Sequence, residues 1–312
     1  MVNGISQQSQ TTHVNESTEM RVVITSNCMT GGLTSAFSML FPTARVVPLP
    51  YVGVDEGVLS DQLSIADAWL VSSPADAQTA ALGRAKNARL KVISFPELYF
   101  NAFHPDQVYA WMRDGSLVES ATGPYNSAIA LWAWQHGLNA QQAISLFTPE
   151  IFGALGYHDR WQVSIDRLRH DFVPFPHLDY RDFIIPLQRA GNFMHTVNHP
   201  KVHAMAQMAR ILAKQIDPTV DAESVPVENM MVDGLFMASF SWSVYPSVAN
   251  ALGLKGAFMW KLEDHSVIGL EEFVQRSFAK YEVQQPHNVD CHELLWPIYD
   301  EVLLPLANGG KL

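Results

Sequence analysis

The sequence predicts an α/β protein in which a short parallel sheet is followed by a large helical remainder. In the N-terminal third, short apolar runs rich in β-branched residues alternate with longer amphipathic segments. From about residue 122 onwards, the apolar residues recur with helical spacing. The chain has 312 residues, of which 48% are hydrophobic, so it can bury a substantial core.

The predicted strands are RVVIT, ARVVPL, DAWLVSS and RLKVISF, with helices expected at about 32–41 and 75–85 and a polar stretch reaching residue 61. Parallel strands bring their carboxyl ends to one edge of a sheet, where ligands bind. We therefore expect the chemistry at the residues that follow these strands, which are Ser26-Asn27-Cys28, Ser72-Ser73 and Phe95-Pro96-Glu97.

The helical remainder begins near Tyr125 and pauses at Gly137, and Asn139 is the expected N-cap of the next helix. Further helices are expected at 161–172 and from His199 to Ile216, the latter with Pro200 at its first position. The segment after residue 217 is expected to be mostly helical, with one strand at 256–261. Residues 1–19 lack an apolar core and read as a flexible tail. No repeat or linker divides the rest, so 20–312 are expected to form one composite domain.

The composition excludes several classes of function. A net charge of −11 disfavours binding to nucleic acid or anionic lipid. No apolar run approaches the ~20 residues that a membrane span requires. Two cysteines without CxxC spacing predict neither a disulfide scaffold nor a zinc site, and a reducing cytoplasm is expected. The glycine-rich loops of kinases and dehydrogenases are missing from the sequence.

The stretch VVITSNCMTGGL places Cys28 between a strand and a helix that opens with Gly31 and Gly32. A helix N-terminus lowers a thiol pKa and binds anions, although a free cysteine can equally be a small buried residue. In HTVNHP, His199 precedes a proline that starts a helix, so its ring can point out of the helix mouth. A thiol with a neighbouring imidazole is the minimum set for nucleophilic or general-base chemistry.

Strand-SNC-GG and the late His-Pro resemble the first and last blocks of the SGNH hydrolases, with Cys28 at the serine position and His199 at the histidine. In this sequence Thr196 stands at the aspartate position, and no Gly-x-Asn-Asp block is evident. The N-terminal part is therefore expected to be SGNH-like.

Seven segments in order resemble the WcbI family of capsular polysaccharide biosynthesis enzymes: SNCMTGGL, ISFPELYFNAFHPDQVY, GPYNSAIALWAWQHGL, FGALGYHDRW, FMHTVNHPKVHAMAQMA, YPSVANALGLKGAFMWK and LEEFVQRSFAKY. The resemblance implies a coenzyme A-dependent acetyltransferase that uses acetyl-CoA and a carbohydrate acceptor, and association with polysaccharide assembly enzymes is an expectation of the same resemblance. Phosphate groups of CoA need backbone donors and cations. The candidates are Met29, Thr30, Gly31, Gly32, Arg181, Lys201, His203, Lys255 and Lys261.

Three other features have structural explanations. FHPD, residues 104–106 with the preceding Phe, is expected to start a helix. His195, His199 and His203 recur every four residues, but Pro200 interrupts that spacing, so no metal site is predicted. Trp132 and Trp134 are expected in the core.

Three hypotheses follow for function. In the first, an O-acetyltransferase uses His199 as general base or Cys28 as nucleophile, with Asn27 and the helix-start amides stabilising the oxyanion. The second is a thiol-dependent carbohydrate esterase. The third is a noncatalytic CoA-binding component of polysaccharide assembly.

Overall fold

The structure of the chain, a computed structural model, describes residues 19–50, 54–72, 87–287, 289–291 and 296–307. It confirms the α/β class. A central sheet contains four parallel strands in the order β2-β1-β3-β4. The strands are β1 (Arg21–Ser26), β2 (Arg45–Pro50), β3 (Ala68–Val71) and β4 (Lys91–Ser94).

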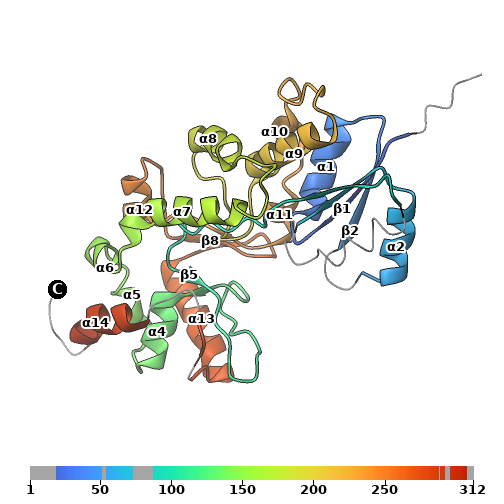
Figure 1. Cartoon of the computed structure of the whole chain (residues 1–312). Coiled ribbons are helices and arrows are strands. Elements are labelled where there is room, and N and C mark those ends of the chain that lie inside the picture. The colour runs from blue at the N-terminus through green and yellow to red at the C-terminus, as the bar shows by residue number, and fades with distance from the viewer. Residues whose placement is uncertain (1–18, 51–53, 73–86, 288, 292–295, 308–312) are drawn as a thin grey trace, which may run out of the picture.

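The sheet is buried on both faces because apolar residues occupy successive positions of its strands. In β1, Val22 and Ile24 face the main core while Val23 faces a second, smaller one. Helices α1 (Thr30–Leu40) and α9 (Val202–Ile216) pack against each other on the first side, and α2 (Glu56–Ser64) lies on the other (Figure 1). From the sequence, the residues of α2 were predicted only as a polar stretch, because few apolar residues recur at helical spacing in this exposed helix.

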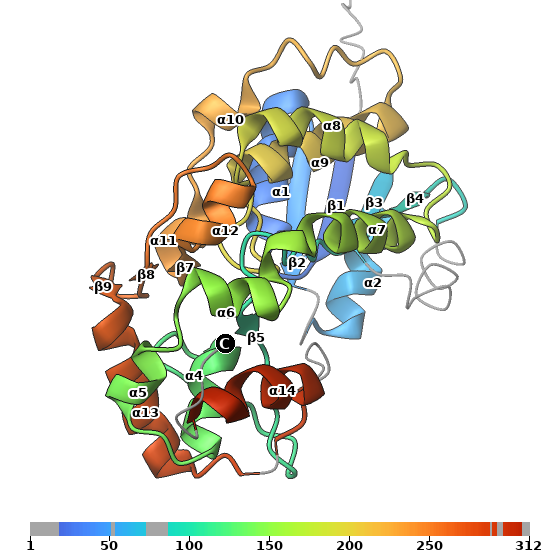
Figure 2. The same ribbon diagram turned by 90° about the vertical axis from the view of Figure 1, so that its left-hand side faces the viewer.

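Part of the helical remainder lies away from this sheet, as Figure 2 shows for α4, α5 and α13, whereas α8 and α10 pack on α9. Its helices are α4 (Ala128–Gln135), α5 (Ala140–Ile144), α6 (Pro149–Ala154), α7 (Arg160–Phe172), α8 (Tyr180–Ala190), α10 (Val227–Met230), α11 (Gly234–Ala238), α12 (Pro246–Ala251), α13 (Leu270–Gln284) and α14 (Trp296–Ala307), with a 3-10 turn at Tyr157–Asp159. Two small antiparallel sheets join it, β5 (Gln107–Val108) with β6 (Asn126–Ser127), and β7 (Ser241–Trp242), β8 (Met259–Lys261) and β9 (Val267–Gly269).

Several predicted boundaries are confirmed. Asn139 caps α5 in a reciprocal capping box with Gln142. The helical run before it ends at Gly137, whose φ of +73° favours glycine. A strand, β8, lies within the expected 256–261, and Trp132 is buried in the core.

Two predictions about proline are wrong. Pro200 does not begin a helix: it forms a β-bridge with Met194, and α9 starts at Val202. FHPD starts no helix either, because the chain turns at 105–106 and continues into β5. The predicted helix at 75–85 and most of the predicted tail at 1–19 lie outside the described residues. One cluster of buried residues runs from Val22 to Leu303, and the single composite domain stays a prediction.

Candidate functional site

The first part of the site is the tight connection between β1 and α1, residues 26–30, which we call the elbow. In this sheet order the chain leaves β1 for β2 on one side and later returns to β3 on the other, so the elbow lies at the switch point where α/β sheets bind ligands. Thr30 locks the elbow: its hydroxyl accepts from Ser26 N at 3.1 Å and lies 2.6 Å from Ser26 O. Asn27 Oδ1 accepts from Met29 N at 3.1 Å. Cys28 is thereby left exposed at the tip of the elbow.

The second part is a hairpin at 194–200, which the Met194–Pro200 bridge closes. His195 N donates to His199 O at 2.7 Å, and Thr196 Oγ1 accepts from His199 N at 3.1 Å. The Cys28 thiol points at this hairpin, because its Sγ lies 3.8 Å from the carbonyl oxygen of Asn198. The structure therefore brings the elbow to the residue that precedes His199, across 170 positions of sequence.

Both nitrogens of the His199 ring have hydroxyl partners. Nε2 lies 3.2 Å from the hydroxyl of Tyr125, and Nδ1 lies 3.2 Å from Oγ of Ser239. Burial, together with the nearby His195, lowers the pKa of His199 to about 4. The imidazole is therefore neutral at pH 7 and can accept a proton.

The environment of Cys28 acts in the opposite direction. Although Cys28 is an exposed residue, the protein around its sulfur partly desolvates the thiol, and this desolvation together with the nearby Glu97 carboxylate raises the pKa of the thiol to about 12. Asn27 donates a hydrogen bond to the same carboxylate, whose own pKa is raised by burial. With a protonated thiol and a neutral imidazole, the resting site contains no thiolate–imidazolium pair.

A second, parallel set of polar contacts lies beside His199. His195 Nε2 is 2.7 Å from Asp233 Oδ2, and its Nδ1 is 3.3 Å from Ser241 Oγ. Ser239 and Ser241 stand two positions apart on an extended segment, so each faces one histidine of the hairpin. Asp233 accepts a hydrogen bond from His195. Burial alone would raise the pKa of Asp233, but this hydrogen bond and the nearby positive charge of Lys201 hold that pKa below its usual range.

The predicted anion-binding residues of the elbow separate into two groups. Met29 and Thr30 are buried, with the Met29 amide already bonded to Asn27. Gly32 faces α9, where a Cβ would lie 2.0 Å from Met205 Sδ, so this glycine serves helix packing. Gly31, the residue directly after the elbow, faces open space and leaves room for a ligand.

The predicted cations also differ in availability. Lys261 donates to the carbonyl oxygens of Phe236 and Ser239 at 2.6 and 2.8 Å, so its ammonium is engaged by the backbone. Arg181 pairs with Asp179 and lines a separate cavity between α8 and α9. Lys201 is the N-cap residue of α9 directly after the hairpin, and within the described part of the chain its ammonium makes no hydrogen bond.

Two further predicted cations are exposed. His203 lies on the first turn of α9, where it is one of the groups that lower the pKa of the nearby Glu228. Lys255 lies on the loop after α12. Neither forms a hydrogen bond or ion pair with the elbow or the hairpin within the described part of the chain. The sequence offered Lys201, His203 and Lys255 on equal terms, and the structure singles out Lys201 by its position.

Three residues of the site were not predicted from the sequence, and these are Tyr125, Asn198 and Ser239. Glu97 was expected near the site because it follows the fourth strand, whereas Tyr125 and Asn198 stand without a distinguishing signal inside the GPYNS and HTVNHP motifs. Tyr125 donates to Asn198 Oδ1 at 3.0 Å and thereby joins two motifs that no spacing rule connects. Ser239 carries no local signal.

Metal binding and membrane crossing find no support in the part of the chain that the structure describes. No three side chains among its histidines, cysteines, aspartates and glutamates gather in a way that could hold an ion. None of its helices combines the length and the apolar character of a membrane span.

Comparison with known proteins addresses the whole arrangement. The family model for the polysaccharide biosynthesis enzyme WcbI matches residues 21–220. A solved structure described as WcbI, a novel polysaccharide biosynthesis enzyme, in a native form without a disulfide bond between CoA and a cysteine, is similar over 92% of this chain and 95% of its own. Its TM-score is 0.67 at 14% identity, which shows a shared fold.

A search of curated proteins gives no match. The SGNH-like character expected for the N-terminal part is not confirmed by any of these comparisons. The family match, in contrast, spans well over half of the 312 residues and contains both the elbow and the hairpin. The chain therefore belongs to the WcbI family of polysaccharide biosynthesis enzymes.

Proposed function

We propose that this chain is a CoA-dependent O-acetyltransferase that acetylates a sugar hydroxyl during biosynthesis of a capsular or related polysaccharide. The observation that carries the proposal is the approach of the Cys28 elbow to the hairpin of His199, 3.8 Å from thiol to Asn198 carbonyl. The similar solved structure names CoA together with a cysteine, which supports CoA as the donor. Both cysteines of this chain are free thiols, which supports a reducing cytoplasm.

The protonation states favour direct transfer. Neutral His199 takes the proton of the sugar hydroxyl, and the sugar oxygen attacks the thioester carbonyl carbon. The tetrahedral intermediate then expels the CoA sulfur, which regains a proton from the imidazolium. An acyl-enzyme on Cys28 would first require loss of a thiol proton whose pKa is about 12. In direct transfer, Cys28 stays protonated, and its S–H can donate a hydrogen bond to the departing sulfur.

The surrounding residues have supporting roles in this scheme. Asn27 has its side-chain N–H engaged by Glu97 in the resting site, so a bound thioester must compete for that donor to use it for the oxyanion. Gly31 leaves space at the helix start. Lys201 is the cation best placed for a CoA phosphate, because it follows the hairpin directly and its ammonium makes no hydrogen bond to other described residues.

Transfer of radiolabelled acetyl from acetyl-CoA to methyl glycosides of glucose, galactose, mannose and N-acetylglucosamine tests the proposal. His199→Ala should abolish transfer, and His203→Ala, an exposed histidine on the same segment, should leave it intact. Cys28→Ala separates the mechanisms, because appreciable residual transfer excludes an acyl-enzyme. Full activity in His199→Ala would overturn the scheme. Release of acetate from acetylated glycosides without CoA would instead favour the esterase.

A further inference from the structure

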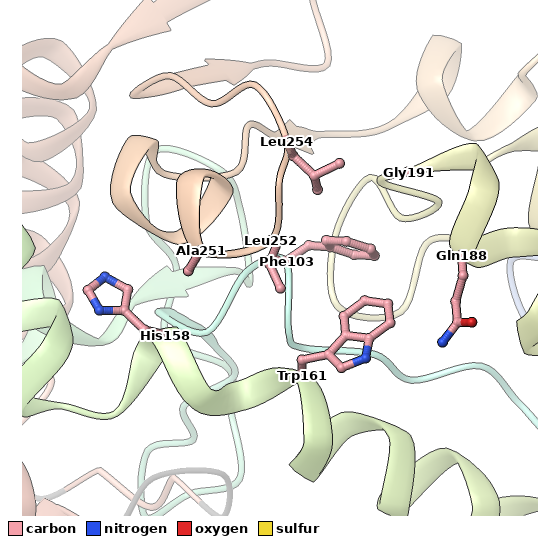
Figure 3. A pocket seen from close by; sticks show the side chains of 8 residues that line it. All are labelled: Phe103, His158, Trp161, Gln188, Gly191, Ala251, Leu252 and Leu254. Atoms are coloured by element: carbon pink, nitrogen blue, oxygen red, sulfur yellow. The ribbon is translucent and has the colours of Figure 1, made fainter.

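A cavity of about 400 Å³ lies between α7, α8 and the end of α12 (Figure 3). This volume falls within the ~300–1,000 Å³ that is usual for small-molecule sites. Its lining consists of Phe103, His158, Trp161, Gln188, Gly191, Ala251, Leu252 and Leu254. None of these residues is bonded to Cys28 or His199 in the described structure, so the cavity is separate from the proposed reaction centre.

The middle of the cavity is an aromatic platform. Figure 3 shows the rings of Phe103 and Trp161 together at its centre. The indole of Trp161 is held by edge contacts from two phenylalanines, Phe100 and Phe103, with ring centroids 5.3 and 5.9 Å away. Since these contacts fix the ring while Trp161 remains only half-buried, the indole offers a rigid surface to a ligand.

Polar groups lie at the two ends of this platform. His158 stands at one end, and a hydrogen bond of 3.1 Å between its Nε2 and Ser247 Oγ orients the ring. Gln188 stands at the other end, and its side-chain amide has no hydrogen-bond partner among the described residues. An amide supplies two donors and an acceptor, and an imidazole supplies one group of either kind.

The lining carries no lysine, arginine, aspartate or glutamate. The cavity between α8 and α9 differs in this respect, because Arg181, Asp182, Lys214 and Glu223 line it. A phosphate in the uncharged cavity would lose its hydration without gaining a counter-charge, which is costly. The phosphate-bearing part of CoA is therefore excluded from this cavity, and a neutral ligand is favoured.

We propose that this cavity binds a neutral saccharide ring. The C–H face of such a ring packs on the electron-rich face of an indole, and its hydroxyls need hydrogen-bonding groups at the edges, which is the arrangement of Trp161, Gln188 and His158. The inference rests on the proposed function in one respect, in that the occupant would be a unit of the acceptor carbohydrate.

The cavity is connected to the reaction centre through the backbone. Gly191 lines the rim with a φ of +79°, and a side chain there would strain the backbone and lie 3.3 Å from Leu254. The chain then runs through Phe193, whose ring meets Phe103 at 5.0 Å, directly into the hairpin. A saccharide seated on the platform therefore lies beside the segment that leads to His199, as a second contact for a polymeric acceptor.

Fluorine NMR of the full chain labelled with 5-fluorotryptophan tests this site without CoA or turnover. Trp161→Phe identifies the Trp161 resonance, and the probes are methyl glycosides of glucose, galactose, mannose and N-acetylglucosamine. We expect at least one of them to shift that resonance saturably, while inorganic phosphate leaves it unchanged. Gln188→Ala, which removes an exposed side chain, should weaken the binding about tenfold, equivalent to the loss of roughly one good hydrogen bond.

The control is Trp134→Phe, which alters a tryptophan in a different surface cavity that contains Glu282, and it should leave binding unchanged. The proposal is overturned if none of the four glycosides moves the Trp161 resonance, or if Gln188→Ala leaves their affinity unchanged. Cys28→Ala should bind saccharide normally. Binding without any acetyl transfer would refute the proposed function and leave this site standing.

Discussion

Two His-Pro motifs of this chain end in opposite situations. In residues 104–106, Asp106 is fully buried and accepts hydrogen bonds from Ile129 N, Tyr157 and Tyr245 at 2.8 to 3.1 Å. In residues 198–200, the His199 ring contacts two hydroxyls, and the carbonyl oxygen of the preceding Asn198 lies 3.8 Å from the exposed Cys28 thiol. The first network is closed inside the core, and the second opens at the edge of the sheet.

The role of a polar motif depends on whether groups of the protein itself satisfy its hydrogen-bonding atoms. Burial raises the pKa of Asp106 to about 6, yet its carboxylate accepts hydrogen bonds from donors of the protein itself, so the group serves the fold. The Cys28 elbow and the 194–200 hairpin come from distant parts of the chain and meet at an exposed thiol. Four predictions follow from this contrast.

The largest effect is expected in the closed network. Asp106→Ala leaves a buried amide and two buried phenols without their acceptor, and each unpaired group costs roughly 1–3 kcal/mol, so unfolding should be easier by about 3–5 kcal/mol. Urea denaturation followed by circular dichroism measures this. Asp114→Ala removes an exposed aspartate that binds only Ser116 and should cost less than ~1 kcal/mol. Equal losses in the two variants would remove the distinction.

The open network should show the reverse pattern. His199→Ala is expected to lower the acetyl-transfer rate by about 10²–10⁴-fold, the usual contribution of a general base, because its neutral imidazole accepts the hydroxyl proton. Initial rates with saturating acetyl-CoA measure this. Stability should fall much less than in Asp106→Ala. A variant that unfolds as readily as Asp106→Ala would place His199 in the core instead.

Lys261 contributes both to stability and to the arrangement of the proposed reaction centre. Its ammonium holds the carbonyls of Phe236 and Ser239, and Ser239 in turn contacts His199. Lys261→Met should release this support and lower transfer about tenfold, with a stability loss of roughly 1–3 kcal/mol for the unpaired carbonyls. Steady-state kinetics at several acetyl-CoA concentrations should show the loss in kcat. A pure rise in KM for acetyl-CoA would indicate that Lys261 binds CoA after all.

The smallest effect concerns the Cys28 thiol. Because its pKa is raised to about 12, the thiol is protonated at neutral pH, and alkylation by iodoacetamide should accelerate with pH from 7 to 10 without levelling off. Glu97 contributes to this shift after burial, so Glu97→Gln should lower the thiol pKa and speed alkylation at pH 8 severalfold. Glu119→Gln, whose carboxylate pairs with Lys280, is the matched control. A rate that levels off near pH 8 in the unmodified chain would contradict the assignment.

Sequence alone could predict the parallel sheet because strands such as β1 and β3 are uninterrupted apolar runs. It could place Cys28 correctly, since a strand followed by Gly31-Gly32 forces a strand-to-helix turn. It could not place Pro200, because the bridge to Met194 is a tertiary contact that overrides the usual preference for a helix start. It also had no means of finding Ser239, which reaches His199 across 40 positions.

The most direct test of the central claim is a crystal structure of this chain with coenzyme A bound. We expect the CoA sulfur to contact Cys28 Sγ and to face the ring of His199, with the phosphate groups on the side of Gly31 and Lys201. A complex in which CoA occupies another part of the molecule, with its sulfur away from the elbow, would contradict it.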